Sequence, residues 1–238
     1  YQPQLHTETR VVTGLEALVR WNSPELGPVP PGRFIPIAES LGLMPELGLW
    51  VLDAACRQMR LWHEAGVDVP VAVNLSAHQL RQPDLAQRVR EVLLRHRVPP
   101  AMLILEITES SVMADAARGL GVMARLRLKG FGLSIDDFGT GWSSLAQLSQ
   151  VPFTELKIDQ GFVSGAHKQP RKRAVVEASL DLARKLDLKV VAEGVETVEE
   201  WQLLAGLGCD YAQGYLISPA VPGEQLPDAI LRWRQTHH

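Results

Sequence analysis

The segment Gly132–Phe138 reads Gly-Leu-Ser-Ile-Asp-Asp-Phe, a short apolar run that ends in two adjacent acids and an aromatic residue. Similar runs recur before and after it, and most are separated by stretches with apolar residues at helical spacing. The runs are Tyr1–Thr7, Val11–Trp21, Val69–Ser76, Leu103–Glu109, Gly132–Phe138, Phe153–Asp159, Leu188–Glu196 and Tyr211–Ser218. Near-continuous apolar strands that alternate with helices are typical of a mostly parallel sheet covered on both faces.

Eight such runs in 238 residues predict a closed (β/α)8 TIM-like barrel. A doubly wound open sheet is the alternative, but no Gly-x-Gly-x-x-Gly motif follows the first run. Only about three residues, Glu8–Arg10, separate the first two runs, which is too short for a helix. We therefore expect those two strands to be antiparallel neighbours, so that the barrel has one antiparallel strand near its N-terminus.

The composition limits the classes of protein to consider. Hydrophobic residues make up 46% of the chain, which allows a large core and excludes global disorder. The 24 basic and 27 acidic residues leave no basic excess for binding a nucleic-acid polymer. No apolar run approaches the roughly 18 residues of a membrane span, so we expect no membrane contact by this domain. Cys56 and Cys209 form no metal-type pair and suggest reduced thiols in a cytoplasmic setting.

The domain organisation is expected to be simple. No Pro/Ser-rich linker or low-complexity segment divides the chain, so residues 1–238 are predicted to form a single domain. The chain opens at Tyr1 without Met and without a signal segment, and we expect it to be a part excised from a larger protein.

Oxygen-bearing side chains stand at or near the ends of most apolar runs. They are Glu16, Asn74, Glu106, Glu109, Asp136, Asp137, Asp159, Glu193, Glu196 and Gln213. Because strand C-termini meet at one rim of a barrel, a ring of carboxylates is predicted there. Clustered acids raise one another's pKa unless a cation lies among them, and carboxylates with one amide favour Mg²⁺ or Mn²⁺. Adjacent Asp136 and Asp137 suit two metals roughly 3.5–4 Å apart, as in phosphoryl chemistry.

Several of these residues have simpler interpretations. Glu109, Asp159 or Glu196 could each be a helix N-cap or part of a surface ion pair. Lys157, near the end of the sixth run, could neutralise an acid, or it could form a Schiff base as in aldolase-like barrels. Glycines 139 and 141 could cradle a phosphate or form a tight turn.

The ordered set of motifs resembles the EAL domain family, the cyclic di-GMP phosphodiesterases of bacteria. The match covers essentially all 238 residues, and the order of the motifs is more specific than any one of them. The motifs are Glu16-Ala17-Leu18-Val19-Arg20-Trp21, Phe34-Ile35-Pro36, Asn74-Leu75-Ser76, Glu106-Ile107-Thr108-Glu109, Asp136-Asp137-Phe138-Gly139-Thr140-Gly141, Lys157-Ile158-Asp159, Glu193-Gly194-Val195-Glu196 and Gln213-Gly214-Tyr215.

The resemblance implies metal-dependent hydrolysis of cyclic di-GMP to linear 5′-pGpG, by in-line attack of a metal-activated water. One Mg²⁺ or Mn²⁺ would be held by Glu16, Asn74, Glu106 and Asp136. A second ion would be held by Asp136, Asp137 and Glu193. Lys157 would hydrogen-bond the attacking water and Glu196 would orient groups near it. The catalytic residues implied are Glu16, Lys157, Glu193 and Glu196. Ca²⁺ is expected to inhibit because it tolerates looser coordination.

The resemblance also implies a substrate site and a regulatory loop. The substrate site would be lined by Gln2, Leu18, Arg20, Pro36, Asp137 and Tyr215. Glu109 would anchor a loop containing Phe138, Gly139, Thr140 and Gly141, which in the family couples dimerisation to activity. We therefore expect a homodimer, with Ser143–Ser149 as the candidate contact. Family members are commonly fused to sensory or diguanylate cyclase domains, so the isolated domain could be competent but poorly active.

Two positions depart from the family pattern. Trp142 stands where the family usually has Tyr or Phe, which keeps an aromatic ring. After Tyr215, the family tends to Lys-Pro or Arg-Pro, whereas this chain has Ser218-Pro219-Ala220, so no phosphate contact is expected there.

Two other functions are compatible with parts of the pattern. A receptor that binds cyclic di-GMP without cutting it usually has broken metal motifs. In this chain the residues of those motifs are intact, namely Glu16, Asn74, Glu106, Asp136, Asp137, Lys157, Glu193 and Glu196. A Schiff-base lyase would use Lys157, but such a lysine needs an apolar or cationic setting that lowers its pKa. Hydrolysis is therefore the favoured prediction.

Overall fold

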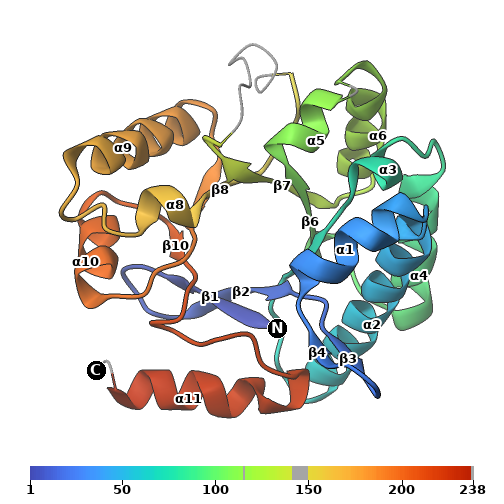
Figure 1. The fold of residues 1–238 in the computed structure, drawn as a ribbon, viewed down its shortest axis with the longest axis horizontal. Helices are drawn as coiled ribbons and strands as arrows, with labels where there is room; N and C mark the ends of the chain where they lie inside the picture. Colours follow the sequence, from blue (N-terminus) through green and yellow to red (C-terminus); the bar gives the residue numbers. More distant parts are fainter. Residues whose placement is uncertain (115, 141–149, 237–238) are drawn as a thin grey trace.

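The computed structural model describes residues 1–114, 116–140 and 150–236. Its main feature is a closed barrel with the strand order β1-β10-β9-β8-β7-β6-β5-β2 and helices around its outside (Figure 1). The barrel strands are β1 (Gln2–His6), β2 (Val12–Ala17), β5 (Val71–Asn74), β6 (Leu103–Thr108), β7 (Gly132–Phe138), β8 (Glu155–Ile158), β9 (Lys189–Ala192) and β10 (Tyr211–Ala212). Each predicted run contains one of these strands, so the predicted (β/α)8 TIM-like barrel is confirmed.

Strand β1 is the antiparallel member of the barrel. It pairs antiparallel with both β2 and β10, whereas the remaining neighbours in the barrel pair parallel. The short first connection therefore predicted the antiparallel strand correctly. In the β1–β2 register Gln2 lies opposite Glu16, so this strand brings an amide side chain next to the first predicted catalytic acid.

The helices pack around the barrel and connect its parallel strands. They are α1 (Pro31–Ser40), α2 (Met44–Glu64), α3 (Ala77–Leu80), α4 (Leu85–His96), α5 (Glu109–Ala114), α6 (Ala116–Leu128), α8 (Gln160–Val163), α9 (Pro170–Lys185), α10 (Val198–Gly206) and α11 (Leu226–Thr236). Short 3₁₀ turns cover Pro100–Met102 and Gly223–Gln225. Within the described ranges, no helix combines the length and the apolar character needed to cross a bilayer.

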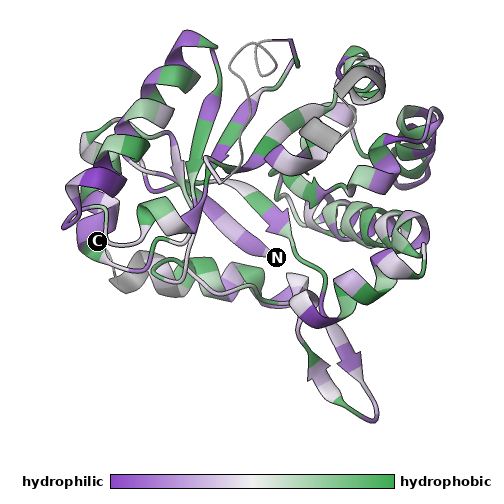
Figure 2. Cartoon of the chain, turned by 45° about the horizontal axis from the view of Figure 1, so that its top comes forward, coloured by the Kyte–Doolittle hydropathy of each residue, from purple (hydrophilic) through white to green (hydrophobic). Residues whose placement is uncertain are grey.

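One short hairpin was not predicted. The run Val11–Trp21 was expected to form one strand, but β2 ends at Ala17. The chain then forms a separate two-stranded sheet from β3 (Trp21–Ser23) and β4 (Gly27–Val29), which projects from the barrel (Figure 2). In the turn, the Ser23 hydroxyl accepts hydrogen bonds from the Glu25 N–H at 3.3 Å and from the Leu26 N–H at 3.2 Å. The apolar run therefore divides between β2 and the first strand of this hairpin.

Alternation along the strands separates an apolar layer from a polar barrel interior. On β7, Leu133 and Ile135 are fully buried in the hydrophobic core, together with Leu126 of α6. Successive side chains of a strand point to opposite faces, so Ser134 and Asp136 face the barrel axis. The same alternation on the other strands sends several acids and a lysine inward. The predicted ring of carboxylates consequently extends from the rim into the interior.

Candidate active site

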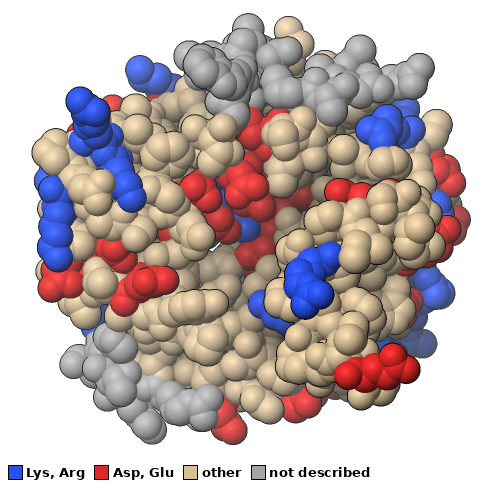
Figure 3. Space-filling view, viewed as in Figure 1, with Lys and Arg blue, Asp and Glu red and all other residues tan. Residues whose placement is uncertain are grey.

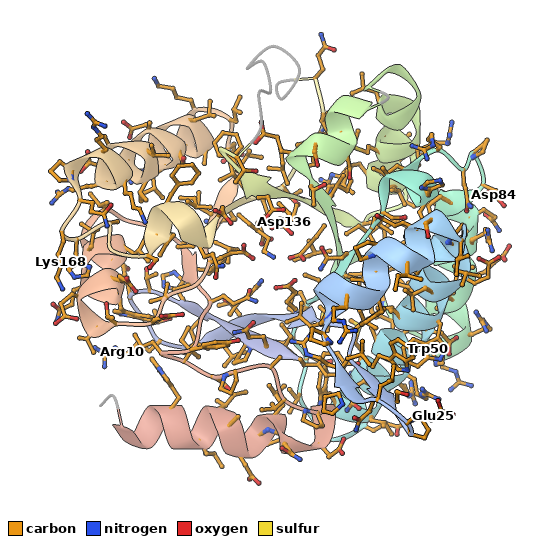
Figure 4. All side chains as sticks on the ribbon, in the orientation of Figure 1. Arg10, Glu25, Trp50, Asp84, Asp136 and Lys168 are labelled. Atoms are coloured by element: carbon orange, nitrogen blue, oxygen red, sulfur yellow. The ribbon has the colours of Figure 1, made fainter. Side chains whose placement is uncertain are left out.

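Lys157 on β8 lies among carboxylates from separate strands. Its side chain is fully buried, with an exposed fraction of 0%. The ammonium nitrogen lies 2.6 Å from Glu193 Oε1, 2.9 Å from Glu106 Oε1, 3.3 Å from Glu16 Oε2 and 3.6 Å from Asp136 Oδ1. We call these five residues the Lys157 cluster. Acidic side chains surround the hollow at the centre of the face shown in Figure 3, and Asp136 points into the same space in Figure 4.

Burial and charge shift the pKa values of this cluster in different directions. Burial opposes the charged form of Lys157, but the four surrounding carboxylates raise its pKa well above the usual value. Burial raises the pKa of Glu106 well above its usual value, Glu16 raises it further, and Lys157 only partly opposes this. Burial also raises the pKa of Glu193 to about 7, again against the attraction of Lys157. The lysine is therefore held protonated, and the acids carry more negative charge than it neutralises.

A bulge in β7 places two consecutive acids in the site. The register between β7 and β8 shifts between Ile135 and Phe138, and Asp137 has a left-handed backbone with φ +54°. Its N–H donates to Asp136 Oδ1 at 2.9 Å. Adjacent residues of a regular strand face opposite sides, so the bulge is what turns both carboxylates toward one volume. Burial and the neighbouring Asp136 raise the pKa of Asp137.

Asp136, Asp137 and Glu193 form the tightest group of potential metal ligands. One oxygen of each carboxylate lies within 4.8 Å of the others, and within the described part of the chain no further group of three acids, histidines or cysteines meets that criterion. This is the set that the resemblance implied for a second ion. Its members are oxygen ligands with surplus negative charge, which fits a hard divalent cation.

Glu16, Asn74 and Glu106 lie on the neighbouring strands β2, β5 and β6. Asn74 Nδ2 donates to Glu16 Oε1 at 3.0 Å, and Asn74 stands opposite Glu106 in the β5–β6 register. Both Glu106 oxygens are buried, and beyond the ion pair with Lys157 no described group donates a hydrogen bond to them. Buried carboxylate oxygens with so few hydrogen-bond donors are suited to bind a metal cation. The structure thus brings together the first predicted ligand set, with the lysine ammonium between its members.

A network of amides fixes the position of Glu16. Gln213 Nε2 donates to Glu16 Oε2 at 2.6 Å and to Gln2 Oε1 at 3.1 Å, while Gln4 Nε2 donates to Gln213 Oε1 at 2.9 Å. Burial raises the pKa of Glu16, but Lys157 and the amide donors outweigh it and lower the pKa below its usual value. Gln4 was missed at the sequence level because an amide early in a strand carries no distinctive signal.

A cavity of about 320 Å³ opens beside the Lys157 cluster. It is lined by Gln2, Glu16, Leu18, Asp136, Gln160, Glu193, Gly194, Glu196, Gln213, Gly214 and Tyr215. A second cavity of about 400 Å³ shares Leu18 with it and is lined by Arg20 and Asn74 among others. Most residues of the predicted substrate site therefore border one of these two spaces. Pro36 is exposed on α1 and is not among the described residues that line either cavity.

The backbone segments that form the cavity wall pack closely against one another at Gly194 and Gly214. A Cβ on Gly214 would lie 2.2 Å from the backbone oxygen of Val195. A Cβ on Gly194, whose φ is +66°, would lie 2.3 Å from Gln160 Cβ. Larger residues at these two positions would push the segments carrying Glu193 and Gln213 away from the cluster.

The structure describes only the first part of the predicted regulatory loop. Glu109 is buried, and its Oε2 accepts a hydrogen bond from the Gly139 N–H at 3.0 Å. The Thr140 hydroxyl donates to the Asp137 carbonyl at 2.8 Å. Glu109 therefore contacts the strand end that continues from Phe138 into the loop, as an anchor would. Gly141, Trp142 and the candidate dimer contact Ser143–Ser149 lie outside the described residues.

The remaining strand-end acids divide between capping and the cavity. Asp159 is the N-cap of α8, with Oδ1 accepting from the Gly161 N–H at 2.9 Å, which matches its simpler interpretation. Glu196 is exposed and lines the cavity. Sequence reasoning missed Gln160 and the buried acid Glu200. The second had a recognisable signal, because Thr197 and Glu200 have the spacing of a helix capping box.

Comparison with known proteins gives consistent results. The family model for the EAL domain matches residues 1–220. The bifunctional diguanylate cyclase/cyclic di-GMP phosphodiesterase MucR of Pseudomonas aeruginosa is 48% identical over 227 residues, covering 95% of this chain and 33% of that protein. The oxygen sensor protein DosP of Escherichia coli is 42% identical, covering 95% of this chain and 28% of that protein. The chain thus spans about a third of the length of these curated relatives.

Solved structures agree with the observed fold. A complex of the MucR phosphodiesterase with cyclic di-GMP superposes with a TM-score of 0.91 at 48% identity, covering 95% of this chain and 92% of that one. The EAL enzyme Bd1971, in a form with cAMP and cyclic di-GMP bound, gives a TM-score of 0.91 at 34% identity, covering 97% of this chain and 63% of that one. The antiparallel barrel strand, the ordered motifs and these matches show that the chain belongs to the EAL domain family.

Proposed function

We propose that this chain hydrolyses cyclic di-GMP to linear 5′-pGpG by in-line attack of water on one phosphorus. The observation that carries the proposal is the Lys157 cluster, in which acids from separate strands converge beside a cavity. Relatives such as MucR and PdeR are named cyclic di-GMP phosphodiesterases, and the MucR domain has been solved with cyclic di-GMP bound.

Mg²⁺ or Mn²⁺ is the proposed cofactor, with two ions per site. Asp136, Asp137 and Glu193 would hold one ion, and Glu16, Asn74, Glu106 and Asp136 would hold the other. The ions, when bound, would lower the pKa of water and neutralise charge on the phosphoryl oxygens. Ca²⁺ should inhibit, because its longer and more variable coordination positions water less well.

The chain's own residues supply charge and orientation. Lys157 stays protonated because the surrounding acids raise its pKa, so it can donate hydrogen bonds to the attacking water but cannot serve as a neutral amine nucleophile. That charge state argues against a Schiff-base lyase. Glu196 lies exposed on the cavity wall, where it can orient groups near the reacting phosphate.

The substrate would occupy the two adjoining cavities. Gln2, Leu18 and Tyr215 line the first, and Arg20 lines the second, where its planar fork can bind phosphate. Asp137 would contact substrate through its position in the acidic group. Pro36 would contribute from the exposed surface of α1, whose residues Ile35 and Glu39 line the second cavity.

We also infer that residues 1–238 are one EAL phosphodiesterase domain of a larger cytoplasmic signalling protein with fused sensory or diguanylate cyclase domains. The length of the curated relatives supports this. The domain is proposed to act as a homodimer, with the Glu109 contact to Gly139 linking the start of the loop to α5. A monomer with full activity at assay concentration would contradict that coupling.

Product analysis tests the proposed function. The purified chain, incubated with cyclic di-GMP and Mg²⁺ or Mn²⁺, should release linear 5′-pGpG, which chromatography separates from the cyclic substrate. Glu16→Ala should abolish turnover. Glu64→Ala is the matched control, because Glu64 is exposed and pairs with Arg60 on α2. Binding of cyclic di-GMP without turnover in Mn²⁺ would instead support a receptor that does not cut its ligand.

A further inference from the structure

Glu200, in the first turn of α10, is a buried acid outside the Lys157 cluster. Its exposed fraction is 3%. Its Oε1 accepts a hydrogen bond from the Gly165 N–H at 2.8 Å, and its Oε2 accepts from the Glu196 and Thr197 N–H groups at 2.9 and 3.1 Å. Backbone donors from two loops, the one after α8 and the one before α10, therefore meet at a single carboxylate. We call this arrangement the Glu200 junction.

The loop before α10 carries residues that line the cavity, and the loop after α8 continues from a short helix that begins with another lining residue. The α8 segment presents Gln160, and the segment before α10 presents Glu193 and Glu196. The two segments also approach closely, because a Cβ added to Gly194 would lie only 2.3 Å from Gln160 Cβ. In Figure 1, α8 and α10 lie on the same side of the barrel, next to β10. A shift of either loop would therefore change the shape of the cavity wall.

The charge state of Glu200 suits this role. Burial raises its pKa, but the backbone donors of Gly165, Glu196 and Thr197 outweigh burial and lower the pKa below the usual value. The carboxylate is consequently ionised at neutral pH, and hydrogen bonds from N–H groups to an ionised acceptor are stronger than those to a neutral one.

We propose that Glu200 is a positioning residue for the reaction of this site: it holds Glu196 and the α8 segment with Gln160 at their places on the cavity wall. This inference rests on the proposed function. Glu200 is not among the described residues that line the cavity, so it acts through the backbone of the two loops.

Glu200 also completes a helix capping box, and that structural role can be separated from the positioning role. In the box, Thr197 Oγ1 accepts from the Glu200 N–H at 3.3 Å and the Glu200 carboxylate accepts from the Thr197 N–H. The bonds to Gly165 and Glu196 are additional. Thr197→Ala removes part of the cap and leaves those two bonds in place. Glu200→Ala removes both roles.

The experiment compares Glu200→Ala, Glu200→Gln and Thr197→Ala in the same chain. Glu200→Ala should lower kcat for cyclic di-GMP about 10- to 100-fold, as misplaced supporting groups do. Thr197→Ala should lower the Tm while leaving kcat and KM near wild type. Glu200→Gln keeps one acceptor oxygen, but its NH₂ group cannot accept the second loop's hydrogen bond. It should therefore recover most of the Tm and only part of kcat.

Amide hydrogen exchange supplies a readout that needs no substrate. Exchange at Gly165 and Glu196 should be faster in Glu200→Ala and unchanged in Thr197→Ala. Unchanged exchange in Glu200→Ala, or the same kcat in Glu200→Ala as in Thr197→Ala, would overturn the inference. If the wild-type chain released no linear product, the proposed function would fail and with it the effect on kcat. The exchange data would then still show whether Glu200 holds the loops.

Discussion

The Lys157 cluster and the Glu200 junction both bury acids, but they compensate them differently. In the Lys157 cluster, four carboxylates share one ammonium, and burial raises the pKa of Glu106 and Glu193. At the Glu200 junction, three backbone N–H groups serve one carboxylate, and its pKa stays below the usual value. At Glu106 and Glu193 burial outweighs the attraction of Lys157, whereas at Glu200 the backbone donors outweigh burial.

This difference fits two different roles. The Lys157 cluster can bind a cation, and the Glu200 junction holds the backbone of two loops in place. An acid with surplus donors is stable in its charged form and makes a rigid contact. Acids with too few donors are poorly compensated until a cation arrives, and that is the condition a metal site requires. Each prediction below tests one side of this contrast.

Removal of the buried Lys157 ammonium should have the largest effect on the free energy of unfolding. Lys157→Met leaves the carboxylates of its cluster without their partner, and breaking a buried ion pair typically costs about 3–5 kcal/mol. The free energy of unfolding, measured with urea at pH 8, should fall by that amount. Lys185→Met is the control, because Lys185 is exposed on α9. A variant too unstable at pH 8 should regain stability at lower pH, where the acids protonate; equal stability of the two variants would contradict the contrast.

The metal-free chain should respond to pH with opposite signs in the two regions. Because the pKa of Glu193 rises from 4.5 to about 7 on folding, the folded chain binds a proton that the unfolded chain has released. The free energy of unfolding should therefore fall by about 3 kcal/mol as pH rises through that window. The pKa of Glu200 is lowered, so its contribution is present above pH 4.5 and is lost as the pH falls further.

Denaturation curves at several pH values check these signs. Glu193→Gln should flatten the slope between pH 4.5 and 7, and Glu200→Gln should flatten the slope on the acid side. The same slope in wild type and Glu193→Gln would show that this acid does not titrate as the structure indicates.

Metal ions should stabilise the Lys157 cluster and should not stabilise the Glu200 junction. Ligand at 100 times its Kd adds about 2.7 kcal/mol, which corresponds to a Tm increase of about 5–10 °C for a domain of this size. Mn²⁺ should raise the Tm of the wild-type chain by at least this amount and that of Asp137→Asn by less, because this change weakens the ion held by Asp136, Asp137 and Glu193 and leaves the other ligand set intact. Glu177→Gln, an exposed change on α9, is the control that should respond as wild type does. An equal rise in Asp137→Asn would show that Asp137 is not a metal ligand.

The smallest effect concerns Asp159, which could have been a ligand or a cap. The structure shows the cap, so Asp159→Ala should lower the free energy of unfolding by about 1 kcal/mol. The affinity for Mn²⁺, measured by calorimetry, should remain nearly unchanged. A large loss of Mn²⁺ affinity would show that Asp159 is a metal ligand and not only a helix cap.

Local patterns in the sequence predicted a large part of this protein. The apolar runs placed all barrel strands, and the short gap at residues 8–10 predicted the antiparallel one. The strand-end position of Glu16, Glu106 and Asp136 predicted that they would meet. These features succeed because period-two alternation and loop length are properties of neighbouring residues. The hairpin after Ala17 was missed, because the continuous apolar run Val11–Trp21 carries no local signal that β2 ends at Ala17.

The sequence by itself determined the strands, the barrel and the identity of the acids, since each depends on residues close together in the chain. Only the tertiary structure decided that the Lys157 ammonium lies between both ligand sets, that a bulge turns Asp137 beside Asp136, and that Glu200 reaches Gly165 across 35 residues. Closure of the barrel creates these contacts, and both the charge of an acid and its pKa depend on which distant donors that closure brings within reach.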